Sequence, residues 1–161
     1  MTMGLSYNIV DRKGKPVVEL IGSVDENSES VLRKIHDAVK GDCEINFKGV
    51  EIINSQGIML WIEFFDQFQI GRNVVFTECP SDVVIQINMI PRFLGSAKIG
   101  SFYCNFICRD CECEESVIMK TEDGYENLSS QCLDRKCTEC GGELELDEDR
   151  DSYFGFTKEN F

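Results

Sequence analysis

The sequence predicts an α/β fold, with a mixed sheet packed against helices and followed by a small cysteine-bearing β module. Apolar residues in the first hundred positions switch repeatedly between the two-residue repeat of strands and the 3.6-residue repeat of helices. Seven of the nine cysteines lie from Cys104 to Cys140. Residues 101–161 hold 16 of the 29 acidic residues but only 6 of the 16 basic ones. We therefore divide the chain into a first domain, residues 1–103, and a second, residues 104–161.

The elements of the first domain follow from their apolar spacing. In chain order, we expect strands at residues 6–11 and 16–21, a helix at 27–40, a strand at 44–47, a helix at 55–70, a strand at 73–78, a helix at 81–90 and a strand at 99–106. The turn Lys13-Gly14-Lys15 indicates that the first two strands form a hairpin. Alternating strands and helices in this order predict a mixed sheet in an α/β layer.

Each helix of the first domain has a start signal. Asn27 or Ser28 can cap the first helix, and Asn54 or Ser55 the second, through a side-chain oxygen that accepts from free backbone N–H groups. Pro80 lies just before the third helix, where proline suits a helix start. In the second domain, we expect short strands at residues 116–121 and 143–147, with a turn at 123–124, forming a β-ribbon that carries the cysteine loops.

The composition limits the classes of partner. The formal net charge is −13 and the isoelectric point is near 4.4, so the surface repels phosphate backbones and anionic lipids. No apolar stretch approaches the roughly 20 residues that a bilayer requires, and the N-terminus lacks a basic region followed by an apolar run. We expect a cytoplasmic protein that binds neither nucleic acid nor membrane.

Four cysteines have the spacing of a metal site. Cys108 and Cys111 form one CxxC pair, Cys137 and Cys140 form another, and 25 residues separate the two pairs. Two such pairs resemble a zinc ribbon, in which four thiolates converge on one Zn²⁺. Iron in a rubredoxin-like site is the alternative, because thiolates also suit iron.

The predicted metal is structural, and we expect no enzyme. Four thiolates fill the coordination of zinc, whereas a catalytic zinc keeps an open position. The single histidine, His36, lies far from the cysteines in the sequence. Three more cysteines lie nearby: Cys104, Cys113 and Cys132. Cys113 or Cys132 could substitute as a metal ligand. The alternative, for all three, is a free thiol or a small packing residue. Cys43 and Cys79 are expected to be buried in the first domain.

One segment of the first domain resembles part of a known protein family. Residues 45–61 form a strand, a loop and a helix that opens with Asn54-Ser55-Gln56-Gly57. This arrangement resembles the STAS family, the domain of anti-sigma-factor antagonists and of sulfate-transporter tails, which has an Asp-Ser-Ser/Thr-Gly-type loop after its third strand. The resemblance covers about residues 5–105. With the four-cysteine ribbon and the tail Tyr153-Phe-Gly-Phe156, the chain looks like a bacterial subfamily of small STAS proteins, which implies no assigned activity.

The resemblance implies a phosphoacceptor and a protein partner. In anti-sigma-factor antagonists, a partner kinase phosphorylates the first serine of the loop, which is Ser55 here. Asn54 replaces the usual Asp and Gln56 replaces the second hydroxyl residue, while Gly57 matches the family glycine. A regulatory binding module would then recognise a regulator, a serine kinase or an anti-sigma factor, and homodimerisation is left open. A helix cap at Ser55, and a constitutive scaffold with no phospho-switch, are the alternatives that the Asn and Gln replacements favour.

The helix after Ser55 carries more apolar surface than one sheet face requires. One stripe can face the sheet, and a second stripe is expected either to pack under the cysteine-bearing module or to dock a partner. The second stripe consists of Trp61, Phe64 and Phe68.

Overall fold

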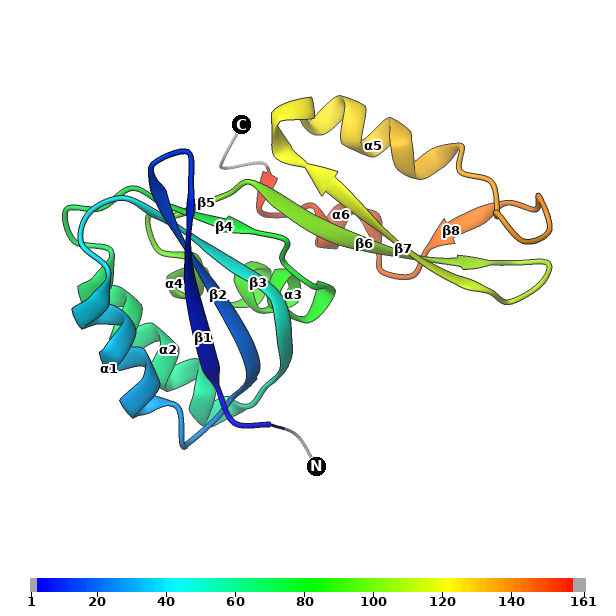
Figure 1. The fold of residues 1–161 in the computed structure, drawn as a ribbon. Helices are drawn as coiled ribbons and strands as arrows, with labels where there is room; N and C mark the ends of the chain where they lie inside the picture. Colours follow the sequence, from blue (N-terminus) through cyan, green and yellow to red (C-terminus); the bar gives the residue numbers. More distant parts are fainter. Residues whose placement is uncertain (1–2, 158–161) are drawn as a thin grey trace.

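A computed structural model describes residues 3–157 of the 161-residue chain, apart from the side chain of residue 125. It contains a five-stranded sheet and a three-stranded sheet with their helices (Figure 1). In chain order the elements are β1 (Ser6–Arg12), β2 (Lys15–Val24), α1 (Glu29–Ala38), β3 (Cys43–Ile53), α2 (Ser55–Phe68), β4 (Val74–Thr77), α3 (Ser81–Met89), α4 (Pro91–Leu94), β5 (Lys98–Ile99), β6 (Ser101–Cys108), β7 (Glu114–Lys120), the 3₁₀ turn η1 (Thr121–Asp123), α5 (Tyr125–Leu133), β8 (Leu144–Leu146) and α6 (Arg150–Tyr153). The predicted α/β class with a mixed sheet is confirmed.

The five-stranded sheet runs in the order β1-β2-β3-β4-β5, with β1 antiparallel to β2 and all other neighbours parallel. The predicted hairpin is confirmed: Arg12 pairs with Lys15 across a two-residue turn. Lys13 and Gly14 both have positive φ, 55° and 82°, the backbone of the tight turns that match strand twist. β2 and β3 are longer than predicted, because after two register shifts Val24 still pairs with Ile53.

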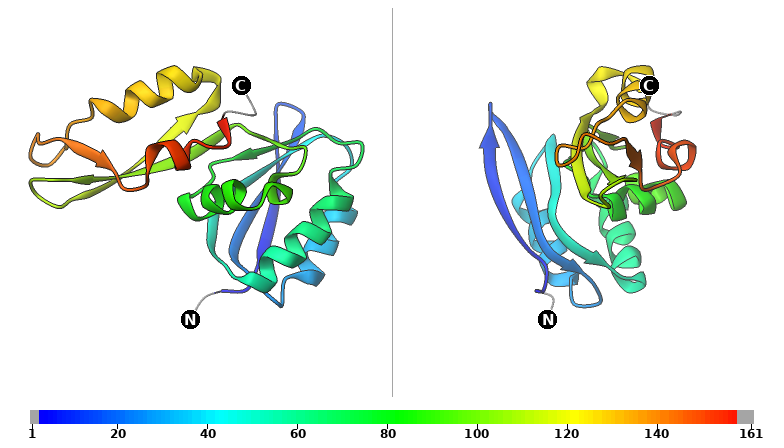
Figure 2. Two further views of the ribbon diagram at one scale, coloured as in Figure 1. Left: turned by 180° about the vertical axis from the view of Figure 1, so that it is seen from behind. Right: turned by 90° about the vertical axis from the view of Figure 1, so that its right-hand side faces the viewer.

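The helices α1 to α4 cover one face of this sheet, and no helix within residues 3–157 covers the other face (Figure 2). Alternating strand residues such as Ile45, Phe47 and Phe76 point into the core beneath the helices. Trp61 lies at its centre, stacked on Phe65 with ring centroids 5.6 Å apart and donating its indole N–H to the Phe93 carbonyl at 3.0 Å. This aromatic cluster holds α2 and α4 on the sheet.

The prediction of a single strand at residues 99–106 in the first sheet is wrong. The chain changes sheets at Gly100: β5 completes the five-stranded sheet, whereas β6 begins the second sheet, whose order is β7-β6-β8. The predicted division between residues 103 and 104 lies within β6. The Cys79 backbone joins the two sheets by accepting from Tyr103 N–H at 2.8 Å and donating to the Ser101 carbonyl at 3.2 Å. One cluster of buried side chains runs through both sheets.

The second sheet includes both strands predicted for the module, but it also carries a helix that we did not expect. The predicted turn at residues 123–124 leads into α5, with Gly124 at φ 83° just before the helix. α5 lies along β6 and β7 (Figure 1). The aromatic tail folds back onto the protein, since Phe154 and Phe156 make edge-on ring contacts with Phe102.

Candidate functional site

The fold brings the two CxxC pairs together at the end of the second sheet. Cys108 ends β6 and Cys111 lies in the following turn, while Cys137 and Cys140 lie in the loop before β8. The four Sγ atoms all lie within 4.8 Å of one another. Cys108 Sγ is 3.5 Å from Cys140 Sγ, and Cys111 Sγ is 3.6 Å from Cys137 Sγ. The predicted ligand set therefore forms one cluster, close enough to hold a metal ion.

The two loops that carry these cysteines repeat one hydrogen-bond pattern. In the first loop, Cys108 N–H donates to the Cys113 carbonyl at 2.9 Å, and Glu112 N–H donates back to the Cys108 carbonyl at 3.0 Å. In the second loop, Cys137 N–H donates to the Gly142 carbonyl at 2.7 Å, and Gly141 N–H donates to the Cys137 carbonyl at 2.9 Å. The equivalent residues Glu112 and Gly141 both have positive φ, 61° and 76°. Each CxxC pair thus lies in the same tight turn, which directs both thiols to one side.

Backbone N–H groups in the loops point at sulfur. Glu139 N–H donates to Cys137 Sγ and Gly142 N–H to Cys140 Sγ, each at 3.4 Å. Hydrogen bonding from the backbone of Cys111 lowers the pKa of Cys108 to about 7, because such donors stabilise the thiolate. Thiolate is the form of cysteine that binds metal, and these backbone donors favour it at Cys108. At Cys111 and Cys140, backbone hydrogen bonds act in the same direction, but hydrogen bonds with neighbouring thiols outweigh them and raise the pKa.

The two loops also contact each other closely. A Cβ built on Gly142 would lie 2.2 Å from an Asp110 carboxylate oxygen, so a larger residue there would displace the Asp110 side chain. Arg109 N–H donates to the Glu143 carbonyl at 3.4 Å, and the Arg109 guanidinium pairs with Glu145. Two of the four cysteines are buried and two are exposed, which places the cluster at the protein surface.

The remaining cysteines lie outside this cluster of four. Cys104 on β6 and Cys132 on α5 are both buried, and the hydrogen bond with Cys132 raises the pKa of Cys104. Cys43 and Cys79 are buried as expected, and burial raises the pKa of Cys43 to about 11 and that of Cys79 further. Cys43, Cys79 and Cys104 are therefore held in the neutral form, which makes them poor nucleophiles, whereas the hydrogen bond with Cys104 lowers the pKa of Cys132.

The segment that carries the STAS resemblance forms the start of α2. Asn54, not Ser55, is the N-cap: its Oδ1 accepts from Gly57 N–H at 2.8 Å, and its Nδ2 donates to Glu26 at 2.9 Å. The hydrogen bond from Asn54 lowers the pKa of Glu26 below its ordinary value. Ser55 and Gln56 are exposed. The Ser55 hydroxyl is therefore accessible and is not the cap of this helix.

We expect Asn54→Ala to lower the free energy of unfolding by about 1 kcal/mol, the usual effect of removing an N-cap side chain. Ser55→Ala serves as the matched control and should leave stability unchanged, because that hydroxyl makes no capping bond. Chemical denaturation of the two variants and the parent chain measures both values. An equal loss for both variants would show that Ser55 shares the capping role.

Three of the predicted partner-binding residues are buried, which corrects that part of the prediction. The side chains of Trp61 and Phe68 are 1% and 0% exposed and belong to the core. Gly57 is also buried, and a Cβ there would lie 2.0 Å from the Val24 carbonyl oxygen, so this glycine permits α2 to approach the end of β2. Their apolar spacing could not distinguish core from surface, because the second stripe of α2 packs against α1 and α4 rather than facing solvent.

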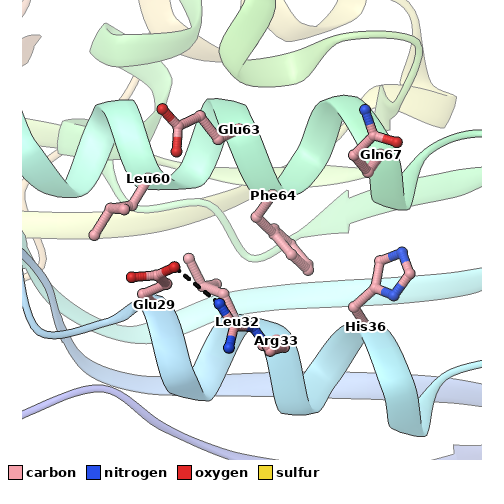
Figure 3. A pocket seen from close by; sticks show the side chains of 8 residues that line it. All are labelled: Glu29, Leu32, Arg33, His36, Leu60, Glu63, Phe64 and Gln67. Carbon is pink, nitrogen blue, oxygen red and sulfur yellow. Dashed lines mark hydrogen bonds and ion pairs between the residues drawn. The ribbon is translucent and has the colours of Figure 1, made fainter.

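Phe64 lies in a groove between α1 and α2 with a volume of about 440 Å³ (Figure 3). Leu60 and Phe64 point from α2 toward α1, whose Leu32 contributes apolar surface from the other side. Charged and polar side chains surround the groove, including a Glu29–Arg33 ion pair at 2.9 Å. The sequence did not predict that α1 forms one side of a groove, because its apolar pattern indicates only an amphipathic helix.

Comparison with known proteins does not assign the chain to a family. No protein-family model matches the chain, and no curated protein matches it significantly. The likeness to the STAS family thus depends on the element order and the loop at residues 54–57. Among residues 3–157, no helix is both long and apolar enough to cross a membrane.

Proposed function

We propose that this chain is a non-enzymatic regulatory module that binds a protein partner through the start of α2 and the α1–α2 groove, with phosphorylation of Ser55 as the switch. One observation carries the proposal: Ser55 is the first residue of α2, is exposed, and is relieved of the capping role by Asn54. A serine that is only a structural cap would use its hydroxyl on the backbone, whereas this hydroxyl is free for a kinase to reach.

A phosphate at Ser55 would change the surface without unfolding it. The helix N-terminus favours negative charge, so the fold tolerates a phosphoserine there. The added charge of about −1.5 to −2 would lie near the exposed carboxylate of Glu26, which Asn54 holds in place. A partner that docks on this surface would meet a strongly negative patch after phosphorylation, which favours release.

The α1–α2 groove supplies the apolar contact for such a partner. Its floor of Leu32, Leu60 and Phe64 suits an apolar anchor, and its charged rim suits polar contacts around that anchor. From the resemblance, the partner would be a regulator of the serine kinase or anti-sigma factor type, in a bacterial cytoplasm.

We further propose that the four-cysteine cluster binds Zn²⁺ in a structural role. Four thiolates at about 2.3 Å from one zinc ion stand about 3.8 Å apart, which agrees with the short Sγ–Sγ distances of 3.5 and 3.6 Å. Four sulfur ligands leave zinc no open position for a substrate. The ion would tie the end of β6 to the loop before β8.

Phosphopeptide mass spectrometry on the protein from its own cells tests the switch directly, using the peptide that contains Ser55. Ser55→Asp should lose the native partner in affinity capture, while Ser55→Ala should retain it. Ser130→Asp, which adds the same charge at an exposed position on α5, is the matched control and should retain the partner.

A constitutive scaffold is the second candidate function. Asn54 holds the loop through bonds to Gly57 and Glu26 that require no phosphate. An unmodified Ser55 peptide across growth conditions, together with equal partner capture by Ser55→Asp and Ser55→Ala, would favour this scaffold over the switch.

A further inference from the structure

β1 is an open edge of the five-stranded sheet. Within residues 3–157 it pairs with β2 on one side and with no strand on the other. The right-hand view of Figure 2 shows it at the outer margin of the molecule, on the side away from the second sheet. Six of its seven residues are exposed and the seventh is half-buried. An exposed edge strand of this length is a template for pairing with a further strand.

Pro16 shows which backbone groups of β1 face outward. Asp11 lies opposite Pro16, which has no N–H, so these two residues form a non-hydrogen-bonded pair. Because the two kinds of pair alternate along an antiparallel ladder, Ile9 and Tyr7, two and four positions earlier, are in pairs of the same kind. The N–H and C=O groups of Tyr7, Ile9 and Asp11 therefore point away from β2, toward the open edge.

The same edge exposes apolar side chains. Ile9 and Val10, in the middle of β1, are 41% and 40% exposed. Successive side chains of a strand point to opposite faces, so one of the two lies on each face of the sheet. A strand that paired with β1 would cover both side chains as well as bonding to the outward backbone groups.

The hairpin tip at the end of β1 is basic. Arg12, Lys13 and Lys15 lie there, in a chain whose formal net charge is −13. Within residues 3–157, neither lysine makes an ion pair, and the single ion pair of Arg12 is a long one, 3.8 Å from Glu44. This basic tip (residues 12–15) therefore has positive charge to offer a partner.

The other end of β1 lies beside acidic residues. Ser23 N–H, near the end of β2, donates to the Met3 carbonyl at 2.9 Å, just before β1 begins. Two positions after Ser23 the chain enters an acidic turn (Asp25–Glu26), whose carboxylates make no ion pair within residues 3–157. The basic tip and the acidic turn lie at opposite ends of the β1–β2 hairpin (Figure 1).

We propose that β1 pairs antiparallel with β1 of a second copy of this chain, which joins the two five-stranded sheets across a twofold axis at Ile9. This register pairs all seven residues, with Tyr7 opposite Asp11 and Ser6 opposite Arg12. The outward backbone groups of Tyr7, Ile9 and Asp11 then meet the same groups of the second copy, so the added ladder is regular. Ile9 meets Ile9, and no two like charges lie opposite each other.

Charge favours a second copy, and the antiparallel direction, over other occupants. Antiparallel pairing brings the basic tip of each copy toward the acidic turn of the other, so attraction between opposite charges acts twice in each dimer. Parallel pairing would bring the two basic tips together, where like charges repel. An edge whose two ends have opposite charge is complementary to itself under a twofold axis, as a closed dimer requires.

Sedimentation velocity of the full, metal-loaded chain tests the dimer. We expect the weight-average mass to rise from 18.3 kDa toward twice that value between about 5 and 500 µM, a range that detects micromolar Kd values. Non-reducing electrophoresis of the same samples identifies any disulfide-linked species, which is subtracted.

Two variants test the edge and its charge. Ile9→Lys places two ammonium groups opposite each other at the twofold axis and should weaken the dimer about tenfold or more, whereas Met89→Lys, at a side chain 70% exposed on α3, should not. Lys13→Glu removes the attraction at the basic tip and should weaken the dimer about threefold or more. Lys98→Glu makes the same change of charge on β5, at the opposite edge of the sheet, and should leave the Kd unchanged.

Amide hydrogen exchange tests the register. The N–H groups of Tyr7, Ile9 and Asp11 should exchange about tenfold more slowly where roughly nine-tenths of the chains are dimeric, since only the monomer then exposes them. Those of Asn8 and Val10 face β2 and should not change with concentration. Contact through any other face would not give this alternation along β1.

Other results would overturn the proposal. A mass of one chain at every concentration would leave the edge without this partner. A dimer unchanged by Ile9→Lys, or one whose exchange protection falls outside β1, would place the interface on another face. If Ile9→Lys loses the circular dichroism spectrum of the parent chain, Lys13→Glu and the exchange pattern still decide the question.

Discussion

Removal of metal from the four-cysteine cluster is expected to unfold the three-stranded sheet. The three-residue β8 and the loop before it bury little apolar surface of their own, and the metal would join them to the end of β6. Zinc contributes on the order of 10 kcal/mol to the folding of small zinc modules. In full-length protein treated with a chelator at neutral pH, we therefore expect amide exchange in β6, β7 and β8 to rise about a thousandfold or more, with smaller changes in β2 and β3.

Single ligand replacements give the same test without a chelator. Cys140→Ser changes an exposed ligand, so its effect reports metal binding rather than core packing. We expect the metal content of the purified variant to fall well below one ion per chain. Cys113→Ser, next to the cluster but outside it, is the matched control and should retain the ion. Full metal content in Cys140→Ser, or unchanged exchange after metal removal, would contradict a structural metal.

Truncation of Trp61 is expected to have the second large effect, a loss of about 3–5 kcal/mol in the free energy of unfolding for Trp61→Ala. The indole stacks on Phe65 and Phe93 at centroid distances of 5.6 and 5.4 Å, and its N–H donates to the Phe93 carbonyl. Removal leaves a cavity in the core and an unpaired carbonyl at α4. Chemical denaturation monitored by circular dichroism measures the loss.

The matched control is Met59→Ala on the same helix. Met59 is 64% exposed, so its truncation should change stability by less than about 0.5 kcal/mol. If Trp61→Ala instead left stability intact and abolished partner capture, Trp61 would be a docking residue, contrary to its burial. Comparing the two variants separates a core role from a surface role on one helix.

The start of α2 shows how far local sequence signals reach. The sequence placed a helix start at Asn54 or Ser55 correctly, because a cap is decided by residues within one turn. It left open which of the two residues caps, since both side chains can accept the same N–H groups. The structure decides for Asn54 because its amide also donates to Glu26, 28 positions earlier in the chain.

The end of the five-stranded sheet shows where those signals fail. Residues 99–106 read as one strand because they are rich in apolar residues, although the alternation changes phase at Gly100, between Ile99 and Phe102. Which sheet a strand joins depends on partners distant in sequence: β5 pairs with β4, and β6 pairs with β7 and β8. The apolar stripe of Trp61 and Phe68 was ambiguous for the same reason, since only packed neighbours tell core from surface.

The sequence alone determined the features that depend on short-range chemistry. The paired CxxC spacing predicted the cysteine cluster, the Lys13-Gly14 turn predicted the hairpin, and apolar periodicity predicted the α/β class. The tertiary structure decided what requires long-range packing: the burial of Trp61 and the groove between α1 and α2. Each of those features lies between segments that are far apart in the sequence, so no short-range pattern predicts it. They form only when the two sheets and the helices pack together.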